Sequence, residues 1–235
     1  MLLHKKVGYY LLTVTLFVIL ACPWLSVVVA QIPSTPVITA DDFSTDSGLW
    51  TYHGVASRGN GVITLLDNRT DTYSQLWFKR ELGYPFRLEF DAWGEGWGEA
   101  AIMMFFKDKN YVPSGGENNG FQPSTGIAPG YGIEFDYYPY NGDPGSWGTH
   151  HVALIEDNTR NHVAYNMSST SSFPTRVGWS HVMIVVNETH VTVDINGIHW
   201  LDVDHDFDLE YQGFGFCGGC NWNKMLFQID NVIIT

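Results

Sequence analysis

From residue 41 to the C-terminus, apolar and polar residues alternate in short segments instead of recurring at helical spacing. The segments RLEFDAW (87–93) and HVTVDI (190–195) have an apolar residue at every second position, as in a strand with one buried face. The segment AAIMMFF (100–106) is apolar throughout, which is typical of a strand covered on both faces. Turn residues separate such segments at fairly regular intervals. The pattern predicts one all-β domain over residues 41–235, a sandwich or barrel.

Two hairpins are predicted in the second half of the chain, and one long connection in the first. Asn196-Gly197 is a dipeptide that strongly favours a two-residue hairpin turn, and a second hairpin turns around Asn187-Glu188-Thr189. Residues 107–130 show no strand pattern. A loop of that length within a compact all-β domain is usually functional or disordered.

The first 30 residues differ in character from the rest. Two lysines precede an uncharged run of about 20 residues that ends in Val28-Val29-Ala30, with small residues at the positions of a signal-peptidase site. The same run is long enough for an uncleaved membrane anchor. We predict a signal peptide over residues 1–30, a linker over 31–40 and a secreted or cell-surface domain over 41–235.

The charge balance narrows the range of partners. The chain has 12 basic and 25 acidic residues; removing residues 1–30 takes away two lysines and no acid, so 10 against 25 leaves a net charge of −15. Such a chain is repelled by nucleic acid and by anionic lipid, so membrane contact is expected only through residues 1–30, if they stay attached. The excess of carboxylates suits calcium binding. N-x-S/T sequons at Asn68, Asn166 and Asn187 fit an exported glycoprotein.

Two cysteines stand close together in CGGC, as Cys217 and Cys220. In an exported chain this spacing indicates a small disulfide ring or two free thiols, and we expect the disulfide, as a structural staple. A zinc site would need two further ligands nearby, and a redox C-x-x-C would need a helix behind it. The sequence pattern shows neither.

Two carboxylates, Glu134 and Asp136, lie on the predicted buried strand YGIEFDYY (131–138). Residues i and i+2 of a strand project to the same face, so the two acids point together. They repel each other unless a proton or a positive group lies between them. A structural role, in which the acids cap turns or pair with an arginine, is the alternative to metal binding.

The residues that follow supply further donors for a cation. Tyr138 can offer a backbone carbonyl, Asn141 an amide oxygen and Asp143 a carboxylate, all within one turn. His151, or its neighbour His150, begins the next strand and adds an imidazole. The all-oxygen subset suits Ca²⁺, whereas carboxylates with one imidazole suit a transition metal such as Mn²⁺.

The order Glu-x-Asp-x-Tyr-Pro, Asn, Gly-Asp-Pro and His within residues 134–151 resembles the metal-binding segment of the L-type (legume-type) lectins. The segment SGGENNGF (114–121) resembles their glycine-rich loop, and residues 191–209 and 214–234 resemble their closing hairpin and final strands. The resemblance therefore covers most of the chain from about residue 42. It implies a concanavalin A-like jelly-roll sandwich of two antiparallel sheets.

The resemblance also implies two metal ions that order the loops around a sugar. The calcium ligands would be Asp136, Tyr138 (carbonyl), Asn141 and Asp143. A second, Mn²⁺-like ion would be held by Glu134, Asp136, Asp143 and His151. The chain departs from the family in the spacing from Asp143 to His151, which is longer than usual. Either the turn bulges or the second metal is absent.

The sugar-binding residues implied by the resemblance are an acid in the first loop, a glycine amide in the second and the metal-binding asparagine. In this chain they fall on Glu99, Gly116 (or Gly115) and Asn141. Glu99 is one methylene longer than the family's aspartate. An aromatic ring beneath the apolar face of a sugar would complete the site, and the candidate rings are Tyr138, Tyr140, Trp147 and Trp222.

We therefore predict an exported, calcium-dependent carbohydrate-binding protein without catalysis, whose partner is a glycan, glycoprotein or polysaccharide; homo-oligomerisation is left open. One alternative is a glycoside hydrolase of the same fold. One such enzyme family uses Glu-x-Asp-x-Glu on a single strand, but Tyr138 replaces the last acid, which would be the proton donor. The other alternative is a calcium-stiffened structural or adhesive surface protein without a sugar pocket.

Overall fold

The computed structural model describes residues 39–97, 100–106, 130–138, 144, 149–157, 161–169, 176, 178–207, 213–220 and 222–235. The chain divides into two units, Met1–Thr35 and Pro36–Thr235, and all described residues belong to the second. The described residues form fifteen strands. They include no helix long and apolar enough to cross a membrane.

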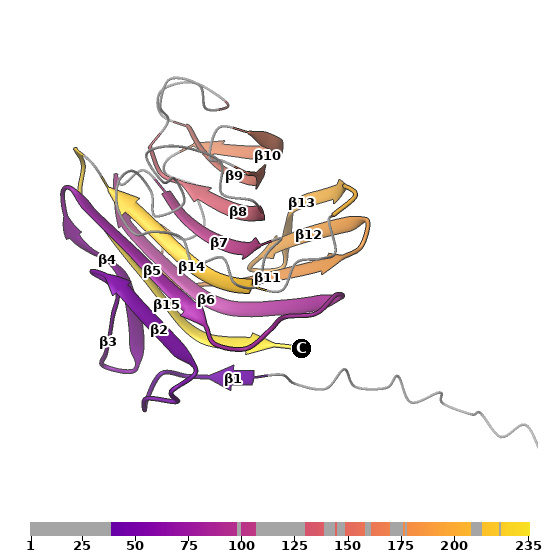
Figure 1. The fold of residues 1–235 in the computed structure, drawn as a ribbon. Coiled ribbons are helices and arrows are strands. Elements are labelled where there is room, and N and C mark those ends of the chain that lie inside the picture. Colours follow the sequence, from indigo (N-terminus) through magenta and orange to yellow (C-terminus); the bar gives the residue numbers. More distant parts are fainter. Residues whose placement is uncertain are drawn as a thin grey trace, which may run out of the picture. The chain divides into compact units, whose positions relative to one another are not determined.

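The strands form two sheets (Figure 1). The order in the eight-stranded sheet is β13 (Ile198–Asp204), β12 (His190–Ile195), β11 (Ser180–Asn187), β6 (Phe86–Gly96), β15 (Met225–Ile234), β4 (Val62–Arg69) and β3 (Ser57–Gly59), with β1 (Thr39–Asp41) also paired to β15. The order in the seven-stranded sheet is β10 (His162–Ser169), β9 (Thr149–Glu156), β8 (Gly130–Asp136), β7 (Ala100–Phe106), β14 (Gly213–Cys220), β5 (Thr72–Phe78) and β2 (Trp50–Gly54). The pairings are antiparallel, so the predicted all-β sandwich of two antiparallel sheets is confirmed.

Aromatic and branched side chains fill the space between the sheets. Along β6, buried residues alternate with partly exposed ones, which is the period expected of a strand with one face on the core. Phe90 of β6 contacts Phe135 of β8 and Phe216 of β14, with ring centroids 6.4 and 5.1 Å apart. Burial of each ring contributes about 1.5–3 kcal/mol to folding. These contacts join the two sheets.

Both predicted hairpins are present. Asn196 and Gly197 have φ values of 53° and 74° between β12 and β13, as a two-residue hairpin turn requires. Asn187 pairs with His190 at the turn between β11 and β12. The domain begins slightly earlier than predicted, because Thr39 and Ala40, which we placed in the linker, pair with Ile234 and Ile233.

Several strand connections leave the sandwich at one end, which we call the loop end. Asp136, the last residue of β8, pairs with Ala100, the first residue of β7. Ala100 also pairs with Gly219 of β14, and Gly96 at the end of β6 pairs with Met225 at the start of β15. The connections that start or finish at the loop end include residues 97–99, 137–148, 170–179 and 221–224, and the short turn over residues 70–71 between β4 and β5.

The connection over residues 107–129 starts and finishes at the opposite end of the sandwich. There Phe106, the last residue of β7, pairs with Gly130, the first residue of β8.

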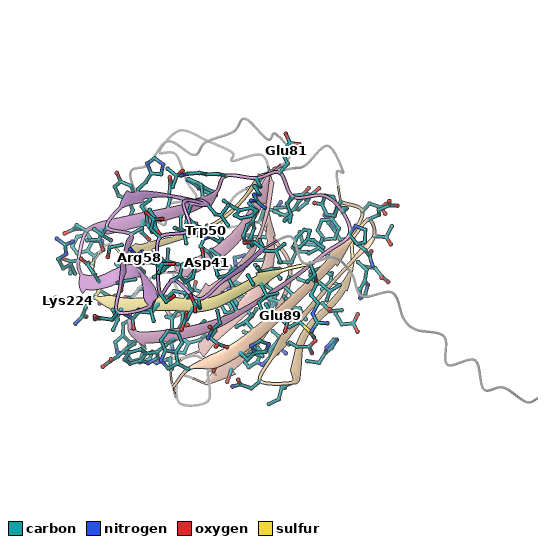
Figure 2. The ribbon with its side chains drawn as sticks, turned by 90° about the horizontal axis from the view of Figure 1, so that it is seen from below. Asp41, Trp50, Arg58, Glu81, Glu89 and Lys224 are labelled. Carbon is teal, nitrogen blue, oxygen red and sulfur yellow. The ribbon has the colours of Figure 1, made fainter. Side chains whose placement is uncertain are left out.

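The first strand is tied to the second sheet by a buried carboxylate. Oδ2 of Asp41 accepts hydrogen bonds from Nε1 of Trp50 at 2.9 Å and from Oγ of Ser47 at 2.5 Å. Oδ1 accepts one from the backbone N–H of Phe43 at 2.9 Å. Figure 2 shows Asp41 and Trp50 close together, with Arg58 nearby. Because β1 belongs to one sheet and β2 to the other, this carboxylate links the two sheets.

Three histidines on the exposed face of the eight-stranded sheet each lie between two carboxylates: His181 with Glu89 and Asp91, His190 with Asp202 and Asp204, and His199 with Asp194 and Asp202. In each case both ring nitrogens lie within hydrogen-bond distance of a carboxylate oxygen. Hydrogen bonds to Asp194 and then to Asp202 raise the pKa of His199.

We expect Asp41→Asn to lower the free energy of unfolding by about 1–3 kcal/mol, because an amide has one acceptor oxygen for three donors and leaves a buried N–H or O–H unpaired. Urea denaturation followed by tryptophan fluorescence measures the change. The control is Asp46→Asn at an exposed turn, where the change should stay within about 0.5 kcal/mol. Equal stability of the two variants would contradict the anchoring role of Asp41.

We expect His199→Gln to lower stability more at about pH 5.5 than at about pH 8.5. A group whose pKa is raised by folding contributes stability that is present below its unfolded pKa and is lost as the pH rises through its folded pKa. Urea midpoints at the two pH values measure the difference. His53→Gln, at an exposed position, is the control. A loss that is equal at both pH values would contradict the assignment.

Candidate metal site at the end of β8

Strand β8 carries two carboxylates in a fully buried setting. Phe135 contacts Phe90 across the core, so its neighbours Glu134 and Asp136 project to the other face of the seven-stranded sheet, as predicted. Nevertheless, only 2% of Glu134 and 5% of Asp136 is exposed. The effective penalty for burying an ionised carboxylate is several kcal/mol unless a positive or hydrogen-bonding partner compensates. The partners of these acids therefore decide what the site does.

Glu134 lies against two imidazoles from the neighbouring strands. Its Oε2 is 3.3 Å from Nε2 of His151 on β9 and 3.2 Å from Nε2 of His162 on β10. The two Nε2 atoms are 3.2 Å from each other. Figure 1 shows β8, β9 and β10 side by side at the edge of the sheet. The three atoms form a nearly equilateral triangle that fits a single metal ion.

His162 reaches this face because of an irregularity in strand pairing. Ala164 pairs with Leu154, but His162 pairs with Ile155, so the register shifts by one residue between them. In an antiparallel pair, opposite residues share a face. The shift moves His162 from the face of Ala164 to the face of His151. Sequence alternation by itself assigns His162 to the wrong face, and the sequence reasoning missed it.

The ionisation of Glu134 is set by its two imidazoles. Burial acts to raise the pKa of the Glu134 carboxyl, but hydrogen bonds and charges from His151 and His162 outweigh it and lower the pKa. In the described part of the chain, no lysine or arginine lies within 4 Å of this carboxylate; its ion-pair partners there are the two histidines. For Glu134, the described residues therefore give no support to the alternative of an arginine partner.

Asp136 is turned toward the connection that follows β8. Its Oδ1 accepts a hydrogen bond from the backbone N–H of Tyr138 at 2.6 Å, which fixes the start of the turn. Its Oδ2 is 3.9 Å from Nε2 of His151. Of the predicted metal ligands, the structure brings together Glu134, Asp136, Tyr138 and His151. Asn141 and Asp143 lie outside the described residues.

His150 has a different role from His151. Its Nε2 is 3.3 Å from Nη1 of Arg176, and the Arg176 guanidinium lies 4.8 Å from the centre of the Trp97 ring. Burial, together with the charge of Arg176, lowers the pKa of His150 to about 4. The neutral ring can accept a hydrogen bond from the guanidinium. His150 therefore positions Arg176 and Trp97 at the loop end, a cluster that the sequence reasoning did not find.

Three tryptophans are prominent at the loop end among the described residues. Trp97, Trp179 and Trp222 are 45%, 46% and 90% exposed. The backbone N–H of Trp97 donates to the carbonyl of Lys224, so the 97–99 and 221–224 connections touch. Trp222 was a predicted ring, whereas Trp97 and Trp179 were not. Like Asn141, the following predicted sugar-binding residues lie outside the described part of the chain: Glu99, Gly115, Gly116, Tyr140 and Trp147.

The disulfide expected between Cys217 and Cys220 is wrong. Both are buried, reduced thiols on strand β14. Three residues of extended strand separate their Cα atoms by about 10 Å. A disulfide requires less than about 7 Å. The CGGC spacing predicts a ring only if the backbone turns, and here it continues as a strand between β5 and β7.

No protein-family model and no curated protein sequence matches the chain. Solved structures do match. The lectin I-B4 from Griffonia simplicifolia, in a metal-free form, has a TM-score of 0.66 at 16% identity, over 84% of this chain and 98% of its own. The Emp47p carbohydrate recognition domain has a TM-score of 0.65 at 15% identity, over 87% and 98%.

The exoplasmic/lumenal domain of VIP36, bound to Ca²⁺ and Man3GlcNAc, has a TM-score of 0.63 at 12% identity, over 81% of this chain and 84% of its own. At these identities the likeness establishes the fold. The chain has the concanavalin A-like fold of the L-type lectin domains, as predicted.

We expect both cysteines to titrate with a thiol reagent in guanidinium without reductant, and neither to react in the folded protein. Burial, and then the charge of Glu134, raise the pKa of Cys217, so little reactive thiolate forms. Cys220→Ser, as the control, should remove one thiol from the denatured count. A denatured protein in which neither residue titrates would show that the disulfide forms after all.

Proposed function

We propose that the protein is an exported, calcium-dependent carbohydrate-binding protein that performs no catalysis. The observation that carries this proposal is the buried pair Glu134 and Asp136, which ends β8 where the 137–148 connection begins. In the fold of the L-type lectins, a metal held at this point orders the neighbouring loops. The charge of the buried acids then has a compensating partner, and the loops have a fixed base.

The calcium ion would be held by Asp136, the carbonyl of Tyr138, Asn141 and Asp143. Calcium takes six to eight oxygen ligands, and this set supplies carboxylate, amide and carbonyl oxygens from one short segment. The described part of the segment supports the assignment, because Asp136 already fixes the backbone at Tyr138. In the proposed site the ion performs no chemistry and orders the turn that carries Asn141.

The sugar would bind at the loop end, between Glu99, Asn141 and a glycine amide. Glu99 directly precedes Ala100, whose backbone pairs with Asp136, and this neighbour in sequence supports placing the acid beside the metal-binding segment. Gly115 and Gly116 belong to the 107–129 connection, which starts at the opposite end. Half of that connection can extend about 35 Å. This exceeds the length of β7, about 23 Å, so the glycines can reach the loop end.

Aromatic side chains at the loop end support a sugar-binding role. Exposed tryptophan rings offer flat apolar faces beside polar groups, which suits the mixed surface of a sugar. Of the two predicted rings that the structure describes, Trp222 is the more exposed, and Trp97 and Trp179 extend the aromatic surface. Tyr138 is partly buried.

The structural neighbours support the same class of function and location. The Emp47p domain is a carbohydrate recognition domain, and the VIP36 domain binds Ca²⁺ and Man3GlcNAc and is exoplasmic or lumenal. An exported protein with a signal peptide over residues 1–30 agrees with these neighbours.

The absence of catalysis is part of the proposal. A glycoside hydrolase needs two carboxyl groups that flank the scissile bond and are open to the substrate. Glu134 is enclosed by two imidazoles, and Tyr138 stands where the proton donor would be. Neither residue offers the general acid that hydrolysis requires.

We expect the protein to be retained on a glycan array with Ca²⁺ and to lose retention in a chelator. Asn141→Ala should weaken binding by at least about tenfold, which is about 1.4 kcal/mol. Asn158→Ala, in the connection between β9 and β10 at the opposite end, is the matched control and should bind as the wild type does. Melting curves with and without chelator accompany the array.

Three outcomes would contradict the proposal. An unchanged melting temperature in chelator would remove the calcium site. Stabilisation by calcium without retention on any glycan would indicate a structural or adhesive surface protein. Release of reducing sugar from polysaccharides would indicate a hydrolase.

A further inference from the structure

We propose that His162 makes the second metal site of this protein a zinc-selective site, formed by Glu134, His151 and His162. The resemblance to lectins implies one imidazole and three carboxylates, a donor set suited to Mn²⁺. The structure instead places a second imidazole beside the first. The inference rests on the metal-binding part of the proposed function and is independent of sugar binding.

The separations of the three donor atoms fit one ion bound to all of them. Zinc lies about 2.0–2.1 Å from an imidazole nitrogen and about 2.0–2.2 Å from a carboxylate oxygen. At tetrahedral angles, such bonds place the ligand atoms about 3.3–3.4 Å apart. The observed separations are 3.2, 3.2 and 3.3 Å. Each agrees to within about 0.2 Å, the tolerance for a metal site.

Hydrogen bonds by themselves leave this triangle unsatisfied. If both Nε2 atoms carry protons, both donate to Oε2 of Glu134, and the two N–H groups then face each other at 3.2 Å. If only one Nε2 carries a proton, the other nitrogen has nothing to donate to the carboxylate. A cation that accepts a lone pair from all three atoms removes the conflict.

Burial holds the three side chains in place before an ion arrives. Glu134, His151 and His162 have side-chain exposures of 3%, 1% and 6%. They come from three adjacent strands, so the sheet itself fixes their spacing. Asp136, whose Oδ2 lies 3.9 Å from Nε2 of His151, is placed to complete the shell.

The type of ligand decides which ion is selected. Divalent-metal affinity rises from Mn²⁺ along the first transition row, and imidazole ligands suit zinc whereas carboxylates suit manganese, magnesium and calcium. Two imidazoles with one glutamate are a known zinc donor set. Replacing one oxygen ligand by His162 therefore shifts the site toward zinc.

The test measures metal affinity directly on the demetallated protein. Titration of ZnCl₂ and MnCl₂ against a competing chelator should show zinc binding at least about 100-fold tighter than manganese. His162→Asn should lower the zinc affinity by at least about tenfold and leave Mn²⁺ and Ca²⁺ binding within about threefold. Comparable affinities for the two ions, or a variant that binds zinc as the wild type does, would overturn the proposal.

The matched control is His199→Asn, because His199 lies between two carboxylates on the other sheet and is one of the competing surface locations for zinc. This variant should keep the zinc affinity of the wild type. Loss of zinc binding in His199→Asn would show that zinc binds at the surface and would overturn the proposal.

Cobalt supplies a readout that does not depend on a variant folding. Co²⁺ added to the wild-type protein should give the intense visible bands of a four-coordinate ion, and ZnCl₂ should abolish them. Weak bands typical of six-coordination would contradict the site. Glycan binding with zinc selectivity absent would overturn this inference alone, whereas zinc selectivity without glycan binding would overturn only the lectin function.

Discussion

The structure depends on one constraint: the carboxylate of Glu134 is buried on strand β8, and its negative charge must be compensated there. An ionised carboxyl out of water is unstable without partners, and the partners come from β9 and β10 as two imidazoles. Since β8, β9 and β10 are hydrogen-bonded neighbours, the sheet that buries the charge also delivers its compensation. The same three side chains are close enough together to hold one cation.

The sandwich places the end of β8 beside the connections of the loop end. Asp136 ends β8 at the loop end, where the connections over residues 97–99, 137–148, 170–179 and 221–224 meet the sheets. The strands fix where each connection starts and finishes. At this end, the Arg176 guanidinium contacts both His150 and the ring of Trp97.

In strands β9, β11 and β12, the side chains on the two faces of the strand have different roles. His150 and His151 are neighbours in sequence, yet one faces Arg176 and the core side while the other faces Glu134. On the eight-stranded sheet, the inner residues of β11 and β12 fill the core and the outer histidines lie between carboxylates. The period of two along a strand allows one segment to do both.

The sequence by itself determined the all-β architecture, both hairpins and the shared face of Glu134 and Asp136. Each depends on the local alternation of a strand or on the positive φ that Asn-Gly tolerates, and neighbouring residues suffice for both. Tertiary structure decided the rest. The register shift that turns His162 toward Glu134, the pairing of β1 with the last strand, and the extended backbone that separates Cys217 from Cys220 all depend on which strands lie side by side. Strand pairing joins residues far apart in the chain, so local pattern does not specify it.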